Sequence, residues 1–179
     1  AVGQGARLEA GEWVPRREGT SRVVRSEGDA HGAGNPQIQQ DPGNIARVAA
    51  VLAQRLGEID PPNSAFYKDR FRDFSARWIA ATEKWERQAA PLKGVAVVEH
   101  HKNMEYLMHW LDLRQVGTLE PKPGVEPSAA HPNELLNQLQ HQPAKVVRRA
   151  SYQDARASDG LAGHAHLPAA GLAFPAWGH

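Results

Sequence analysis

Beyond residue 40, apolar side chains recur at the three- and four-residue spacing of an amphipathic helix. Asp41 followed by Pro42 is typical of a helix start, because the carboxylate can accept from the first backbone N–H groups and proline suits the first helical position. The apolar positions that follow are Ile45, Val48, Leu52, Leu56 and Ile59. The pattern predicts an amphipathic helix that ends at residues 60–63, Asp-Pro-Pro-Asn.

A second helical pattern follows this break and is built mostly from aromatic residues. Its apolar positions are Tyr67, Phe71, Phe74, Trp78, Trp85 and Ala89. Pro91 ends the pattern, so the sequence predicts a helix longer than the first. We interpret the aromatic stripe as core packing rather than as a cofactor pocket, because bulky rings at helical spacing usually bury apolar surface.

After Pro91, short apolar runs alternate with helical segments. The runs predict strands at 95–98, 116–119, 145–149 and 167–174. The segments between them predict helices at 103–112, 129–141 and 155–163. This alternation favours βαβ units, a parallel sheet and right-handed crossovers, which place the carboxyl ends of all strands at one edge.

Several polar residues follow the predicted strands and are expected to meet at this carboxyl edge, where open α/β sheets bind ligands. They are His100, His101, Glu120, Tyr152 and Asp154. The two adjacent histidines come directly after a Val-rich run, and neutral imidazole is a common protein ligand for zinc and related ions. The histidine pair is therefore a candidate metal site.

The composition limits the chemistry of this edge. The 179 residues contain nine histidines and no cysteine, so any metal must be held by nitrogen and oxygen ligands. Lys and Arg number 21 against 20 for Asp and Glu, which gives no reason to expect a nucleic-acid or anionic-membrane partner. No stretch approaches the roughly 20 apolar residues of a membrane span, and the first residues lack a signal-peptide pattern, so we expect a soluble chain, mature or cut.

Several segments carry a more specific signal when they are taken together. They are 34–38 (Gly-Asn-Pro-Gln-Ile), 41–44 (Asp-Pro-Gly-Asn), 90–94 (Ala-Pro-Leu-Lys-Gly), 97–107, and 119–128 (Leu-Glu-Pro-Lys-Pro-Gly-Val-Glu-Pro-Ser) with His131 after it. In order and spacing, over about residues 28–175, the chain resembles the solute-binding proteins of zinc and manganese ABC transporters.

The resemblance implies the carboxyl-terminal lobe of this family and its linking helix. The implied fold class is α/β, with a long linking helix followed by a Rossmann-like parallel sheet of about four strands flanked by helices. It divides the chain into an irregular remnant of the amino-terminal lobe or linker at 1–40, the linking helix at 41–60 and the α/β lobe at 61–179. In the family this helix spans both lobes, so we expect part of its apolar face to be exposed and to favour self-association.

The resemblance also implies a set of metal ligands. His101 matches the family's carboxyl-lobe ligand, because its spacing to Tyr106 is the family's histidine-to-tyrosine spacing, and His100 is its neighbour. Gln37 stands where the family carries a ligand histidine, and an amide oxygen is a poor substitute for imidazole on zinc. His31 lies where related members also carry a histidine and is a candidate to compensate. The expected ligands of Zn²⁺ or Mn²⁺ are thus His101, His31 and His100.

Two carboxylate residues, Glu120 and Asp154, each allow two interpretations. Glu120 suits either an acceptor that orients His101 or a residue that merely caps its own loop. Asp154 could supply a ligand oxygen, but residues 151–155 (Ser-Tyr-Gln-Asp-Ala) favour a helix N-cap.

The function implied by the resemblance is binding of zinc or manganese, as all or part of the solute-binding component of an ABC metal-uptake system. Such a protein is periplasmic or extracytoplasmic, performs no catalysis and delivers its ion to a membrane permease. One alternative is a metal-dependent hydrolase that uses His100 or His101 with Asp154, although no HExxH or GxSxG motif occurs. Another is a degenerate lobe that folds without transporting, which Gln37 favours.

Overall fold

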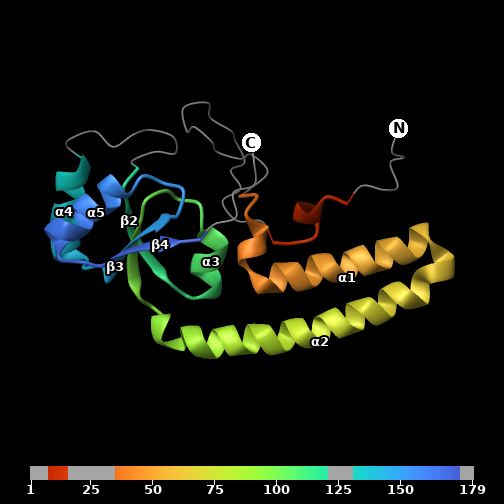
Figure 1. Cartoon of the computed structure of the whole chain (residues 1–179). Coiled ribbons are helices and arrows are strands. Elements are labelled where there is room, and N and C mark those ends of the chain that lie inside the picture. Colours follow the sequence, from red (N-terminus) through yellow and green to blue (C-terminus); the bar gives the residue numbers. More distant parts are fainter. Residues whose placement is uncertain (1–7, 16–34, 121–130, 174–179) are drawn as a thin grey trace, which may run out of the picture.

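The computed structural model describes residues 8–15, 35–120 and 131–173, and it shows a helical hairpin joined to an α/β lobe (Figure 1). In the hairpin, α1 (Pro42–Ile59) and α2 (Ser64–Ala89) run side by side in opposite directions. The elements of the lobe are β1 (Ala96–Glu99), α3 (Glu105–Trp110), β2 (Arg114–Thr118), α4 (His131–His141), β3 (Val146–Ala150), α5 (Ala155–Ala165) and β4 (Ala169–Leu172). The fold class is therefore the α/β class expected from the sequence.

Local hydrogen bonds define both ends of α1. The Asp41 carboxylate accepts from the backbone N–H of Gly43 at 2.8 Å, which confirms the predicted helix start. At the other end, the Asp60 carboxylate accepts from the Asn63 amide and from the Tyr67 hydroxyl, each at 2.8 Å. These hydrogen bonds lower the pKa of Asp60 and hold the turn at which the chain reverses into α2.

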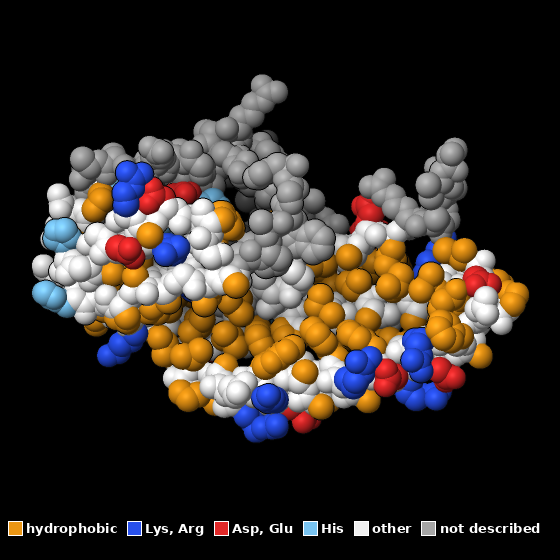
Figure 2. Space-filling view, in the orientation of Figure 1, with side chains coloured by type: hydrophobic (Ala, Val, Ile, Leu, Met, Phe, Trp, Pro, Cys, Tyr) orange, Lys and Arg blue, Asp and Glu red, His pale blue; other side chains and the backbone are white. Residues whose placement is uncertain are grey.

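The aromatic stripe of α2 packs against α1 but is not enclosed. Phe74 and Trp78 stack with 5.4 Å between ring centroids, and the Trp78 indole N–H donates to the Pro42 carbonyl at 2.9 Å. No residue of α2 is fully buried, and Trp85 is 38% exposed. The expectation of core packing is thus corrected to half-buried packing between helices, because a two-helix hairpin covers each ring from one side. Figure 2 shows hydrophobic side chains gathered along this hairpin.

The lobe contains a four-stranded parallel sheet in the order β2-β1-β3-β4. The four predicted strands are confirmed, with ends shifted by one to a few residues, and all four end at the same edge. The helix predicted at 103–112 is shorter, because α3 ends at Trp110 and Asp112 takes a left-handed φ of 51°. A helix cannot continue through this conformation.

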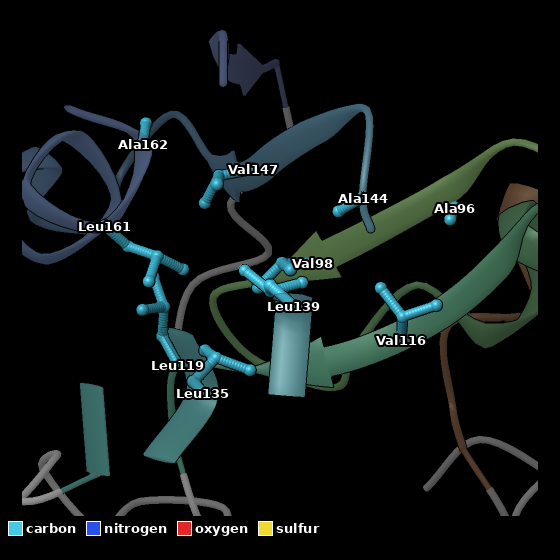
Figure 3. Packing of buried hydrophobic residues seen from close by; sticks show 10 residues of the cluster. All are labelled: Ala96, Val98, Val116, Leu119, Leu135, Leu139, Ala144, Val147, Leu161 and Ala162. Atoms are coloured by element: carbon cyan, nitrogen blue, oxygen red, sulfur yellow. The ribbon is translucent and has the colours of Figure 1, made fainter. Parts of the chain in front are cut away.

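One face of the sheet packs against α4 and α5 and forms the core of the lobe (Figure 3). The buried cluster consists of Ala96, Val98, Val116, Leu119, Leu135, Leu139, Ala144, Val147, Leu161 and Ala162. Gly117 of β2 lies beneath Leu135, and a Cβ at Gly117 would come within 2.5 Å of the Leu135 Cδ1 atom. Glycine at this position therefore lets α4 approach the sheet closely.

The opposite face of the sheet is covered from the side of α3 (Figure 1). Successive strand residues point to opposite faces, so Val98 enters the core cluster while Val97 and Glu99 point toward α3. Tyr106 and Met108 of α3 are buried, Tyr106 completely. The residues at the end of β1 are thus enclosed on both faces, and the chain leaves the sheet directly into His100 and His101.

Candidate metal site

His101 lies just past β1 and is held by a carboxylate from the end of β2. Its Nδ1 atom is 2.6 Å from Oε2 of Glu120, and both side chains are largely shielded from solvent. An ionised carboxylate can only accept, so we assign the proton to Nδ1 and the lone pair to Nε2. This tautomer leaves one nitrogen of His101 ready for a metal ion. The contact supports the interpretation that Glu120 orients His101.

The backbone holds Glu120 opposite the two histidines. The Leu119 N–H donates to the Glu99 carbonyl at 2.8 Å, and the Glu120 N–H donates to the His100 carbonyl at 3.0 Å. The Thr118 hydroxyl donates to the Glu120 carbonyl at 2.8 Å. The pairing of β1 with β2 therefore continues beyond both strands, and it brings together residues 19 positions apart in sequence.

His100 occupies the more buried position of the histidine pair. Its Nε2 atom lies 3.7 Å from Oε1 of Glu120, and its backbone N–H donates to the Arg148 carbonyl at 2.7 Å. Burial lowers the pKa of His100, although the charge of Glu120 opposes this shift. Burial therefore favours the neutral form of this imidazole. Its Nδ1 atom is buried without a hydrogen-bond partner in the part of the chain that the structure describes.

Asp154 sits at the same edge, but its carboxylate is already engaged. It accepts from the Arg156 N–H at 2.9 Å and caps α5, and it pairs with the Arg156 guanidinium. The side-chain hydrogen bond from Arg156 lowers the pKa of Asp154 to about 2. The predicted N-cap is confirmed. Tyr152, also expected at this edge, is exposed, and its hydroxyl accepts from the Asn103 amide at 3.2 Å.

The segment that contains Gln37 is tied to the lobe near the histidines. The Gln40 amide donates to the carbonyl of Asn103, two residues after His101, at 2.9 Å. The buried Tyr106 hydroxyl donates to the Asn35 carbonyl at 3.0 Å. Gln37 itself uses its side-chain oxygen to accept from Gln39 at 2.7 Å. Its amide is thus engaged locally, in the position where the family resemblance expects a histidine ligand.

The described residues contain no group of three or more His, Asp or Glu side chains placed to hold a metal ion. His31 lies outside the residues that the structure describes, so its role as a ligand stays a prediction. His101 with Glu120, and His100 beside them, therefore do not make a complete set of metal ligands within the described residues. Another residue of the sequence motif, His131, contacts the Thr118 carbonyl through Nε2 at 2.9 Å and joins α4 to the end of β2.

Sequence reasoning missed a buried charged pair behind the histidines. Glu99 contacts the guanidinium of Arg148 on the neighbouring strand β3, and neither side chain is exposed to solvent by more than a few per cent. The sequence carries little signal for this pair, because Glu99 directly follows the predicted strand 95–98 and Arg148 is one of three basic residues in the predicted strand 145–149. Their pairing depends on the strand order, which places β3 beside β1.

A family model described as "ZnuA: Zinc-uptake complex component A periplasmic" matches residues 4–174 of the chain. A curated relative, the high-affinity zinc uptake system protein ZnuA of Brucella abortus (strain 2308), is 24% identical over 107 residues. That match covers 60% of this chain and 32% of the relative. The chain thus spans about a third of the length of the curated relative that it matches.

Solved structures show the same fold. The mutant structure of a laminin-binding adhesin from Streptococcus agalactiae matches with a TM-score of 0.71 and 18% identity, covering 96% of this chain and 64% of that one. A ZnuA deletion mutant with zinc bound matches with a TM-score of 0.69 and 19% identity, covering 91% of this chain and 59% of that one. At this identity the likeness concerns the fold.

Proposed function

The chain belongs to the family of periplasmic zinc-uptake complex component A proteins, and from this premise we propose that it binds a divalent transition metal, zinc or manganese. It would act as all or part of the solute-binding component of an ABC metal-uptake system, outside the cytoplasm. The observation that carries the proposal is His101, whose Nδ1 atom is held by Glu120 so that Nε2 is available to an ion. Among the described residues, no helix is long and apolar enough to cross a membrane.

In this proposal the ion is the cargo, and His101 is its ligand from the α/β lobe. Glu120 keeps the imidazole in one tautomer and one orientation, as carboxylates behind metal-bound histidines do. Burial favours the neutral form of His100, which is the form that binds a metal. His31 is the proposed further ligand, and Gln37 contributes little because amide oxygen suits zinc poorly.

The proposed site is incomplete within the described residues, which sets its expected affinity. Zinc normally takes three or four protein ligands, and His101 with His100 supplies at most two. Additional ligands must come from His31 or from another lobe or chain. Imidazole ligands also favour zinc over manganese, because Mn²⁺ binds such sites most weakly among the first-row divalent ions and Zn²⁺ binds them more tightly.

The hydrolase alternative gains no support. It needs a free carboxylate next to the histidines, and Asp154 is instead committed to capping α5 and to Arg156. We therefore propose binding without catalysis, with a membrane permease as the partner that receives the ion.

The division of the chain into an irregular segment (1–40), a linking helix (41–60) and an α/β lobe (61–179) stays a prediction.

We also propose that the hairpin mediates self-association. A groove of about 290 Å³ between α1 and α2 is lined mainly by apolar side chains, among them Leu52, Phe71 and Phe74. Leu52 is 44% exposed. A second copy presents the same surface, so the contact can be symmetric.

Sedimentation over a concentration series tests this proposal and should show dimers. Leu52→Gln should weaken the dimer. Leu92→Gln, at an equally exposed site outside the groove, should leave the dimer unchanged. A strictly monomeric parent chain would contradict the proposal.

Isothermal titration of zinc into the parent chain, His101→Ala and His164→Ala tests the metal proposal. His164 is an exposed histidine on α5 and serves as a matched control. We expect micromolar or tighter binding in the parent and the control, and loss of at least tenfold in affinity in His101→Ala. Equal binding by all three proteins would exclude His101 as a ligand. Absence of binding in the parent would favour the degenerate lobe.

A further inference from the structure

A buried ion pair lies immediately behind the proposed metal-binding loop, on the sheet face that points toward α3. Glu99 and Arg148 are direct partners in the β1–β3 register. Nη2 of Arg148 contacts Oε1 of Glu99, and Nη1 of Arg148 contacts the Met104 sulfur. Glu99 is completely buried, and Arg148 is 5% exposed.

This pair is a poor device for stability. Removing two charges from water is costly, and their attraction compensates only when further hydrogen bonds satisfy both groups. Oε2 of Glu99 and Nε of Arg148 have no hydrogen-bond partner among the described residues. Burial also lowers the pKa of Arg148 to about 10, so the guanidinium stays charged at pH 7 while surrounded by little water. An apolar pair of similar volume would pack here at lower cost.

The pair does, however, contact the loop that contains the two histidines. The loop leaves β1 after Glu99, contains His100 and His101, and reaches Met104 just before α3. Arg148 contacts it three times: the guanidinium touches Glu99 at its start and Met104 at its end, and the carbonyl accepts from the His100 N–H at 2.7 Å. One residue of β3 thereby contacts both ends of the segment 99–104, which contains the two histidines.

We propose that Arg148, paired with Glu99, is the positioning residue of the metal-binding loop and holds His101 in the orientation that meets Glu120. This inference rests on the proposed function, because the orientation matters only if His101 binds an ion. In this role the Arg148 guanidinium binds no metal ion; it acts through the side chains of Glu99 and Met104, which flank the histidines, while its backbone carbonyl accepts from the His100 N–H. The planar guanidinium suits the task, since it can contact Glu99 and Met104 at once, which a lysine ammonium cannot do with the same geometry.

The test uses a double variant that removes the charges but keeps the volume, Glu99→Leu with Arg148→Met. A matched control makes the same two changes in an exposed pair, Glu58→Leu with Arg55→Met, whose side chains are 2.8 Å apart on α1. Circular dichroism and thermal melting establish that both variants fold. Removing one member alone would leave an unpaired buried charge, so single deletions are not informative here.

Two measurements then separate positioning from stability. The first needs no metal: nitrogen-15 NMR of the His101 imidazole reports its tautomer and its hydrogen bond to Glu120. We expect a single Nδ1-protonated form in the parent and control, and averaged tautomers in the buried-pair variant. The second is zinc titration, in which the buried-pair variant should bind about tenfold to a hundredfold more weakly. A folded variant with an unchanged His101 spectrum and unchanged affinity would overturn the proposal.

A conservative variant keeps the test decisive if the double variant does not fold. Arg148→Lys retains the charge opposite Glu99 but loses the simultaneous contact with Met104, so it should fold and show a partial loss of His101 order; an unaltered spectrum would count against positioning. If the parent chain binds no zinc, the proposed function fails, yet the metal-free spectra still decide whether Arg148 orders His101.

Discussion

The helical hairpin and the α/β lobe are made from similarly patterned segments, yet they bury their apolar residues to very different extents. In the lobe, strand residues such as Val98 and Val147 are completely inaccessible to solvent. In the hairpin, α2 contains no fully buried residue, and α1 buries only Pro42 and Asn44. An amphipathic pattern therefore identifies which face of a helix is apolar, but the number of neighbouring elements decides how far that face is buried.

The difference also explains where the candidate site lies. In the lobe, a parallel sheet covered on both faces gives rigid backbone up to the last residue of each strand, and Glu120 is held against His101 by that backbone. The hairpin offers less support, because its two helices pack mainly against each other. The ligands of a metal ion must be positioned accurately, and the rigid backbone at the ends of the sheet strands can do this.

The largest expected effect comes from shortening the same side chain in the two regions. Leu135 of α4 is 2% exposed above the sheet, whereas Leu52 of α1 is 44% exposed. Leu135→Ala should lower the free energy of unfolding by about 2–5 kcal/mol, because it removes buried contacts and leaves a cavity. Leu52→Ala should cost less than about 1 kcal/mol. Urea unfolding of both variants measures this, and equal losses would show that the hairpin is as enclosed as the lobe.

Much of the fold follows from local sequence signals. Runs such as 95–98, together with the caps at Asp41 and Asp154, were sufficient to predict the strands and the starts of two helices. The early end of α3 was not predictable, because it depends on the left-handed backbone of Asp112. The partial burial of the aromatic stripe was also missed, since it depends on what packs against α2 in three dimensions.

The sequence predicted which residues lie at the candidate site, but it did not predict the contacts that hold them in place. The sequence placed His101 and Glu120 at one edge and left open whether they touch; the contact follows from β1 and β2 being neighbours. The pair of Glu99 with Arg148 was missed because β1 and β3 are adjacent although β2 lies between them in sequence. Strand order is a property of the whole sheet, so no local pattern reveals such partners.

A smaller effect is expected from the hydrogen bond that joins the two helices of the hairpin. The Trp78 indole donates to the Pro42 carbonyl at 2.9 Å. Trp78→Phe should destabilise the protein by about 1 kcal/mol more than Trp85→Phe, because the first change removes this hydrogen bond between the helices. Thermal unfolding of the two variants gives the comparison. If Trp85→Phe proves the more harmful, ring packing rather than the hydrogen bond holds the hairpin together.

The smallest effect concerns the lobe edge and depends on pH. The hydrogen bond from Arg156 lowers the pKa of Asp154 to about 2, below its ordinary value of 3.8. A carboxyl whose pKa is lower in the folded protein contributes stability that is complete above the ordinary pKa and is lost as the pH falls toward 2. Asp154→Asn keeps the helix cap, since asparagine also accepts from the first turn, and removes only the charge. The melting temperatures of parent and variant should therefore differ at pH 6 and converge near pH 2. A difference that stays constant over this range would mean that the charge of Asp154 contributes nothing and that the amide simply caps α5 less well.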